Sequence, residues 1–121
     1  ESAAKQDKKY VEADAEPEKG YFYRSDHFEF AKMGVPALYV DGGIDVRGKN
    51  KEFGKLKKNE YTENHYHSLS DEILDEWTYD GMIEDNKILF RVGYAISQHD
   101  EWPTWNEGTE FKAVRETMLT K

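Results

Sequence analysis

The sequence predicts an α/β fold, and three observations support that prediction. Apolar residues recur at helical spacing over residues 75–97. Residues 35–40 (VPALYV) have the length and the apolar composition of a buried strand and end at a D-G-G turn. A short helix that stops at Gly34 precedes them, so helix, tight turn, strand and glycine-rich loop follow in the order typical of an α/β sheet. In such sheets, ligands bind beyond the carboxyl ends of the strands.

The sequence of the N-terminal third predicts short elements separated by residues that break helices and strands, Pro17 and Gly20. Residues 1–9 favour helix but lack a cap and an apolar stripe, which is typical of a truncated helix end. Residues 13–20 form a polar loop, and residues 21–24 are aromatic and extended. Ser25 or Asp26 then caps a helix over residues 27–33.

The rest of the chain alternates between a basic segment and amphipathic segments. Residues 44–59 predict a long loop, either a partner contact or a solvated insertion. Its six basic residues are Arg47, Lys49, Lys51, Lys55, Lys57 and Lys58. Residues 75–97 predict the strongest helix, with a stripe that faces a core, and residues 109–119 predict a last helix.

Composition excludes several classes of function. The net charge of -8 argues against a nucleic-acid partner, which would require a basic surface. The chain has no cysteine, so disulfides and thiolate metal sites are excluded, and any metal would bind to histidine and carboxylate. No apolar run reaches the ~20 residues that span a bilayer, and the sequence shows no targeting signal.

Residues 61–72 (YTENHYHSLSDE) concentrate the groups that can do chemistry. They contain His65 and His67, an aromatic residue between them, and the carboxylates Asp71 and Glu72. Neutral imidazole is a common zinc ligand and a group for proton transfer near neutral pH. The spacing of two matches no helical zinc motif, so two interpretations remain open. These are a structural or surface role, and a metal or catalytic role in which His67 is the better ligand.

A second cluster, residues 23–27 (YRSDH), lies about forty residues upstream. One interpretation is an N-capped helix with a surface ion pair. The other is a site rim, where Arg24 binds a carboxylate or carbonyl and Ser25 or Asp26 supports a metal ligand. The functional interpretation requires the two clusters to meet in space.

Three segments together resemble the co-catalytic double-zinc aminopeptidases, which are related to glutamate carboxypeptidase and glutaminyl cyclase. Residues 23–39 are similar to the family segment R-S-D-H-x-x-F-x-x-x-G-[VI]-P-A, and residues 66–72 are similar to Y-H-x-x-S-D-E. The third segment, which looks like the C-terminal end of a subgroup, carries Trp102, Pro103, Trp105, Phe111 and Arg115. The resemblance runs over roughly residues 10–116.

The resemblance implies a role for five residues. His67 matches the last zinc-ligand histidine, and Tyr66 matches an aromatic residue that helps to hold the scissile carbonyl. Arg24 stands where some members bind substrate or product, while Ser25 and Asp26 would line the site and orient the ligands. His65 matches no position with a known role. Glu29 and Leu69 stand where the family commonly has proline.

The family's other zinc ligands and its general-base glutamate have no match here, since the chain has no H-x-D segment and no adjacent Glu-Glu pair. We therefore expect residues 1–121 to be the C-terminal fragment of a zinc peptidase catalytic domain, a partial three-layer α/β/α sandwich that is inactive alone. In the intact enzyme, the resemblance implies two zinc ions that activate a shared water and polarise the scissile carbonyl.

The resemblance also sets the expected substrate, location and alternatives. The substrate would be a peptide with a free amino terminus, and the location would be periplasmic or secreted. A fragment of a sheet would expose open edges, so self-association is expected. The alternatives are a metal-free interaction or receptor domain of the same fold, and a glutaminyl cyclase-like enzyme.

Overall fold

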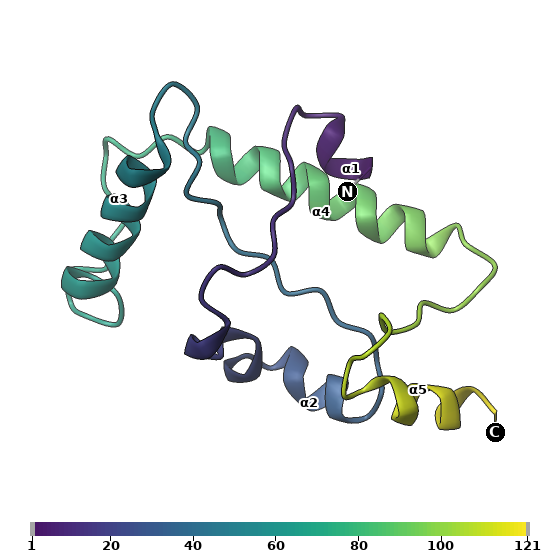
Figure 1. The fold of residues 1–121 in the computed structure, drawn as a ribbon. Coiled ribbons are helices and arrows are strands. Elements are labelled where there is room, and N and C mark those ends of the chain that lie inside the picture. The colour runs from purple at the N-terminus through teal and green to yellow at the C-terminus, as the bar shows by residue number, and fades with distance from the viewer. Residues whose placement is uncertain (1, 121) are drawn as a thin grey trace. The chain divides into compact units, whose positions relative to one another are not determined.

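The computed structural model describes residues 2–120, and across that range every regular element is a helix (Figure 1). In chain order the helices are α1 (Ser2–Lys5), η1 (Pro17–Lys19), η2 (Tyr21–Arg24), α2 (His27–Lys32), α3 (Lys51–Asn64), α4 (Asp80–Ser97) and α5 (Lys112–Leu119), where η marks a 3-10 helix. The chain divides into two compact units, and one boundary falls within α4. The first unit is Glu1–Val40 with Asn86–Lys121, and the second unit is Asp41–Asp85.

The predicted α/β/α sandwich is wrong, because residues 2–120 contain no β-strand. Residues 35–40, the expected strand, have irregular backbone, and Leu38 and Val40 are 62% and 50% exposed. Apolar β-branched residues favour a strand only where a neighbouring strand pairs with their backbone groups. The prediction rested on composition, which says nothing about a pairing partner.

The helix predicted over residues 27–33 is confirmed as α2. It stops at Gly34, whose φ of 86° lies in the left-handed region and whose amide donates to the Ala31 carbonyl at 2.8 Å. A Cβ at position 34 would lie 2.9 Å from the amide nitrogen of Arg115 in α5. Glycine therefore serves two purposes here, since it ends α2 and lets the backbone of α5 approach closely.

Aromatic side chains form the packed centre of the first unit. Phe111 is 9% exposed, and its ring centroid lies 5.0 Å from that of Trp105, 6.1 Å from Phe22 and 6.2 Å from Phe28. The Trp105 indole donates to the Gly34 carbonyl at 3.2 Å. The cluster thus ties η2, α2 and the segment before α5 together, and it positions the start of α2.

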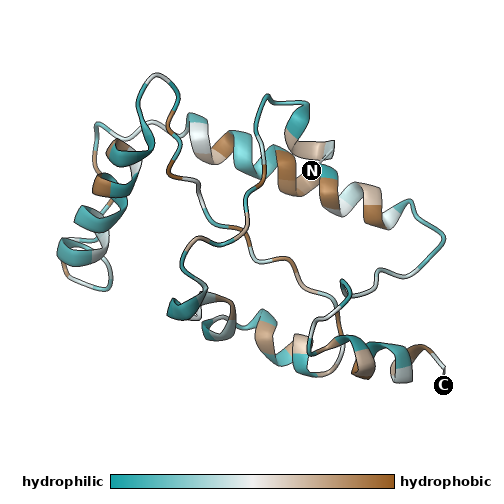
Figure 2. Cartoon of the chain, viewed as in Figure 1, coloured by the Kyte–Doolittle hydropathy of each residue, from teal (hydrophilic) through white to brown (hydrophobic). Residues whose placement is uncertain are grey.

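Hydrophobic burial is otherwise small. Among residues 2–120 the buried hydrophobic residues are Ala4, Ala31 and Phe111. Hydrophobic residues also recur along α4 (Figure 2), where Phe90 is 73% exposed. An ion pair between Arg91 of α4 and Asp7 holds the segment after α1 in the first unit. No helix within residues 2–120 combines the length and the hydrophobicity that crossing a membrane requires.

The loop predicted over residues 44–59 is wrong for its second half, which is helix α3. The Asn50 side chain caps α3 by accepting a hydrogen bond from the Phe53 amide at 2.9 Å. Lysine and glutamate favour helix, but α3 has no continuous apolar stripe, and such a stripe is what predicts the other helices. Gly54 lies against Ile44, since a Cβ at position 54 would meet the Ile44 carbonyl oxygen at 1.9 Å.

Other boundaries differ by a few residues. The helix expected from residue 75 begins at Asp80, after a turn in which the Trp77 amide donates to the Leu74 carbonyl. The last helix begins at Lys112 instead of residue 109, and the helix expected over residues 1–9 covers only Ser2–Lys5. Tyr21–Arg24 is a 3-10 helix and not an extended segment.

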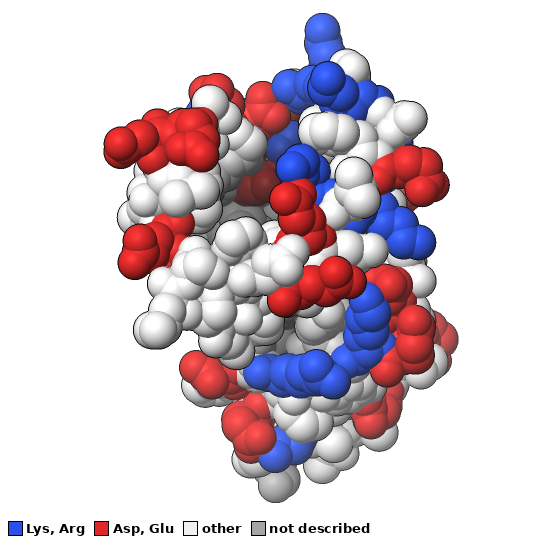
Figure 3. All heavy atoms as spheres, turned by 90° about the vertical axis from the view of Figure 1, so that its left-hand side faces the viewer, with Lys and Arg blue, Asp and Glu red and all other residues white. Residues whose placement is uncertain are grey.

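Three basic residues of the second unit are paired with carboxylates. Lys57 contacts Glu60 at 2.7 Å, and Lys58 pairs with Asp41. Arg47 contacts Glu84 at 2.9 Å. Figure 3 shows acidic and basic side chains interspersed on the face that it draws. Neighbouring carboxylates therefore offset part of the positive charge of this segment.

Candidate functional site

Arg24, Ser25 and Asp26 lie in the first unit, at the junction of η2 and α2. Arg24 is the last residue of η2, and its guanidinium lies 5.7 Å from the centroid of the Tyr21 ring. Asp26 occupies the N-cap position of α2, but neither its side chain nor that of Ser25 makes a capping hydrogen bond. All three residues are exposed. The predicted cap is therefore correct in position only, and the Asp26 carboxylate remains available for another contact.

His27 supports this junction from inside. Its ring centroid lies 4.6 Å from that of Phe22 and 5.3 Å from that of Tyr39. Its Nε2 is buried and has no hydrogen-bond partner among residues 2–120. Next to it, the Tyr23 hydroxyl donates to a Glu110 carboxylate oxygen at 2.8 Å, and this bond raises the pKa of Tyr23. Packed aromatic side chains therefore support the exposed residues Arg24, Ser25 and Asp26.

Tyr66 and His67 lie in the second unit, directly after the end of α3. Their rings stack with centroids 3.9 Å apart and planes 19° apart. Tyr66 is 52% exposed, and His67 is exposed as well. His67 has a φ of 56°, in the left-handed region that residues other than glycine rarely adopt. Uncommon backbone geometry of this kind clusters at functional sites.

A set of hydrogen bonds encloses this pair. The His65 and Tyr66 amides both donate to the Tyr61 carbonyl, at 2.9 and 3.0 Å, which ends α3. The Tyr61 hydroxyl lies 3.0 Å from each carboxylate oxygen of Asp71, so the residues on either side of the pair are joined. Donation to this carboxylate, followed by partial burial and the negative charge of Asp71, raises the pKa of Tyr61.

The two histidines of this segment differ in what their rings contact. His65 is half-buried, and its Nδ1 lies 3.0 Å from the Ser70 hydroxyl. The His67 imidazole stacks on Tyr66, and within residues 2–120 neither of its nitrogens makes a hydrogen bond. Of the two, His67 is therefore the ring with both nitrogens available to a ligand.

The residues of this chain do not by themselves fit a zinc ion. Catalytic zinc takes about three protein ligands. No group of three or more histidine, aspartate or glutamate side chains within residues 2–120 could hold a metal. His67 can supply one imidazole.

The two predicted clusters belong to different units, Arg24–Asp26 to the first and Tyr66–His67 to the second. The expectation that they meet in space stays a prediction. Tyr61 was not predicted as part of the site, although its distance of four residues from His65 in a helix could have indicated a contact.

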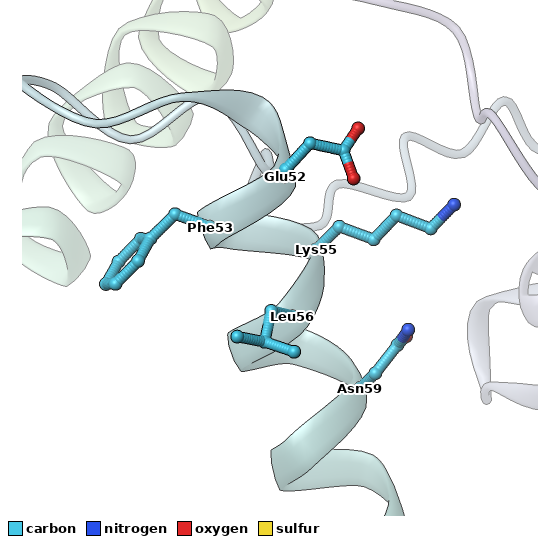
Figure 4. A pocket seen from close by; sticks show the side chains of 5 residues that line it. All are labelled: Glu52, Phe53, Lys55, Leu56 and Asn59. Atoms are coloured by element: carbon cyan, nitrogen blue, oxygen red, sulfur yellow. The ribbon is translucent and has the colours of Figure 1, made fainter.

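A shallow hollow runs along α3, lined by Glu52, Phe53, Lys55, Leu56 and Asn59 (Figure 4). All five residues come from that one helix, and the figure shows Phe53 pointing away from Glu52 and Lys55. None of the predicted site residues lines it. We assign it no role.

Comparison with known proteins identifies the family. No curated protein and no solved structure matches this chain significantly. The model of Peptidase family M28 matches residues 1–90, which include both predicted clusters but not the segment from Trp102 to Arg115. Members of this family are peptidases and are generally zinc-dependent. The match covers most of the chain, which therefore belongs to peptidase family M28.

Proposed function

We propose that this chain is the C-terminal part of a zinc-dependent aminopeptidase, which removes the N-terminal residue of a peptide. Its membership in family M28 supports peptidase chemistry. The observation that carries the proposal is the stacked Tyr66–His67 pair at the end of α3. An exposed imidazole whose nitrogens make no hydrogen bond within residues 2–120 is suited to ligate a metal.

Each site residue has a distinct task in this proposal. His67 supplies one zinc ligand, and the Tyr66 hydroxyl donates a hydrogen bond to the carbonyl side of the scissile bond. Arg24 binds a carboxylate or carbonyl of the substrate or product through its exposed guanidinium. Ser25 and Asp26 orient the groups that hold the metal, a task for which the Asp26 carboxylate is free because it makes no cap.

The remaining zinc ligands and the general base are placed outside residues 1–121 in this proposal. One imidazole falls short of the about three protein ligands of a catalytic zinc site. The isolated chain is therefore expected neither to hold zinc tightly nor to hydrolyse peptides. Tight, stoichiometric zinc binding by residues 1–121 alone, measured by calorimetry, would contradict this part of the proposal.

The test uses the full-length gene product that carries this chain, with a chromogenic aminoacyl substrate and its N-acetylated counterpart. We expect hydrolysis of the free-amine substrate only, loss of activity with a zinc chelator, and recovery on adding zinc. His67→Ala should lower kcat/KM by more than the about 10- to 100-fold that losing a partner of a metal ligand costs. His99→Ala, at an exposed position two residues after the end of α4, is the matched control and should leave kcat/KM unchanged.

Other outcomes point to the alternatives. A protein that binds zinc but hydrolyses neither substrate would indicate a cyclase or a different exopeptidase. A protein that neither binds zinc nor hydrolyses peptides would indicate a metal-free interaction domain. Equal hydrolysis of the free and blocked substrates would exclude an aminopeptidase.

A further inference from the structure

The conformation of His67 needs an explanation within the second unit. A φ of 56° is unfavourable for a side chain with a Cβ, and a short loop adopts it only where neighbouring contacts hold it. The His67 imidazole makes no hydrogen bond to residues 2–120, so its own ring does not supply those contacts beyond stacking on Tyr66. Residues on either side of His67 must therefore hold the loop.

Serine hydroxyls hold the loop from the inside. The Ser68 hydroxyl donates to the His65 carbonyl at 2.7 Å and lies 2.8 Å from the Ser70 hydroxyl. The Ser70 hydroxyl in turn donates to the Asn64 carbonyl at 3.1 Å. These bonds fold residues 68–70 back onto the last turn of α3, and His67 is the residue at the bend.

The bond between Tyr61 and Asp71 closes the loop from the outside. Tyr61 lies in α3 and Asp71 lies beyond the loop, so one hydrogen bond joins positions ten residues apart. The Tyr61 ring centroid lies 6.3 Å from that of His65 and 6.2 Å from that of Tyr66. Tyr61 therefore contacts the residue that stacks on His67 and also anchors the chain after His67.

We propose that Tyr61 and Asp71 are positioning residues, which hold His67 in its left-handed conformation and present the Tyr66–His67 ring pair to solvent. This inference gives the proposed function a mechanism for orienting its metal-ligand histidine, and in that respect it rests on the proposed function. The geometric claim stands independently of any metal, because all of its contacts lie within the second unit.

The experiment measures the backbone conformation of His67 by NMR in the full chain. A residue with positive φ gives a strong intraresidue cross-peak between its amide proton and its Hα, because the two protons are close in that conformation. Tyr61→Phe removes one hydroxyl and keeps the ring, and Asp71→Ala removes the acceptor from a position outside α3. Tyr79→Phe is the matched control, because the Tyr79 hydroxyl makes no hydrogen bond within residues 2–120.

We expect a strong cross-peak in the unchanged chain and in Tyr79→Phe, and at least a twofold weaker one in Tyr61→Phe and in Asp71→Ala. The double variant should be no weaker than either single variant, because both remove the same bond. In the full-length gene product, Tyr61→Phe should lower kcat about tenfold and leave KM unchanged, as expected for a group that positions a metal ligand.

An unchanged cross-peak in Tyr61→Phe and Asp71→Ala would overturn the inference. So would loss of α3 helicity in both variants, because the bond would then serve folding and not the orientation of His67. A cross-peak that weakens as expected, in a protein whose activity survives His67→Ala, would leave the positioning role standing and refute the proposed function. Activity that requires His67 but not Tyr61 would refute the positioning role and leave the proposed function standing.

Discussion

Gly34 shows how one residue can set the packing of the first unit. Its positive φ and the nearby Arg115 and Val114 backbone atoms leave no room for a side chain. We expect Gly34→Ala to lower the free energy of unfolding by at least about 2 kcal/mol, from left-handed strain and overpacking together. Gly108→Ala is the control, because Gly108 has a φ of 80° and a Cβ added there would meet no atom within 4 Å.

The Gly108→Ala control measures the backbone strain alone, without overpacking. Gly108→Ala should cost about 1 kcal/mol, the strain of a left-handed alanine. Urea unfolding followed by Trp105 fluorescence, with the other two tryptophans replaced by phenylalanine, measures both variants. Equal losses at the two positions would show that the close approach of Gly34 to α5 is not present in solution.

Tyr61 offers a residue-scale test that depends on pH. The hydrogen bond to Asp71, partial burial and the charge of Asp71 all raise the Tyr61 pKa. Because the folded value lies above the unfolded one near 10, the stabilisation is present below about pH 10 and is lost as pH rises through the folded pKa. We expect Asp71→Ala to lower the pKa of Tyr61 toward the ordinary value for tyrosine. Glu72→Ala should leave the raised pKa of Tyr61 unchanged.

A titration of tyrosine Cζ signals by NMR measures this pKa, with Tyr61→Phe to assign the resonance. A Tyr61 signal that titrates at the same pH with and without Asp71 would mean that the hydroxyl does not donate to this carboxylate. In that case the hydrogen bond that closes the loop around His67 would be absent in solution.

The packing of helix α3 reverses the usual effect of replacing a helical glycine with alanine. Replacing glycine with alanine inside a helix normally stabilises it by about 0.5–1 kcal/mol. At Gly54 the added Cβ would collide with the Ile44 carbonyl, so we expect Gly54→Ala to destabilise the chain by about 1–3 kcal/mol. Gly93→Ala in α4, where the Cβ position is open, should stabilise it.

Urea unfolding followed by helix circular dichroism compares the two glycine variants. Opposite signs at Gly54 and Gly93 are the expected result. If Gly54→Ala stabilised the chain as Gly93→Ala should, the segment around Ile44 would not pack on α3, and the second unit would lack the contact that fixes the start of that helix.

The elements also show what the sequence could predict. Helices α2, α4 and α5 were predicted because apolar spacing and the Gly34 stop are local signals. Helix α3 was missed because charged residues form half of it and leave no apolar stripe, and the strand at residues 35–40 was wrong because pairing is not local. His67 was selected by motif, but its left-handed φ was not foreseeable, since it arises from hydrogen bonds among Tyr61, Ser68, Ser70 and Asp71.

At the scale of the whole molecule, exposed hydrophobic side chains predict self-association. Phe90 and Tyr94 stack on α4 with ring centroids 6.3 Å apart, and both are exposed. Neighbouring exposed apolar groups of this kind favour contacts between molecules. We expect the dissociation constant from analytical ultracentrifugation to rise at least about tenfold in Phe90→Asp, which places a charge in that contact.

Leu69→Asp is the control for this measurement. Leu69 is 98% exposed in the polar loop after His67, so its replacement adds the same charge at an isolated position. Equal effects of the two substitutions would attribute the change to net charge alone. A chain that stays monomeric at all concentrations would refute the role of the α4 surface.

The central claim is that His67 is a zinc ligand of an M28 peptidase. The most direct test is the zinc content of the purified full-length gene product, measured by mass spectrometry of the metal, for the unchanged protein, His67→Ala and His99→Ala. The resemblance to double-zinc enzymes leads us to expect two zinc ions per unchanged chain, the same in His99→Ala, and the loss of at least one in His67→Ala. An unchanged zinc content in His67→Ala would contradict the account.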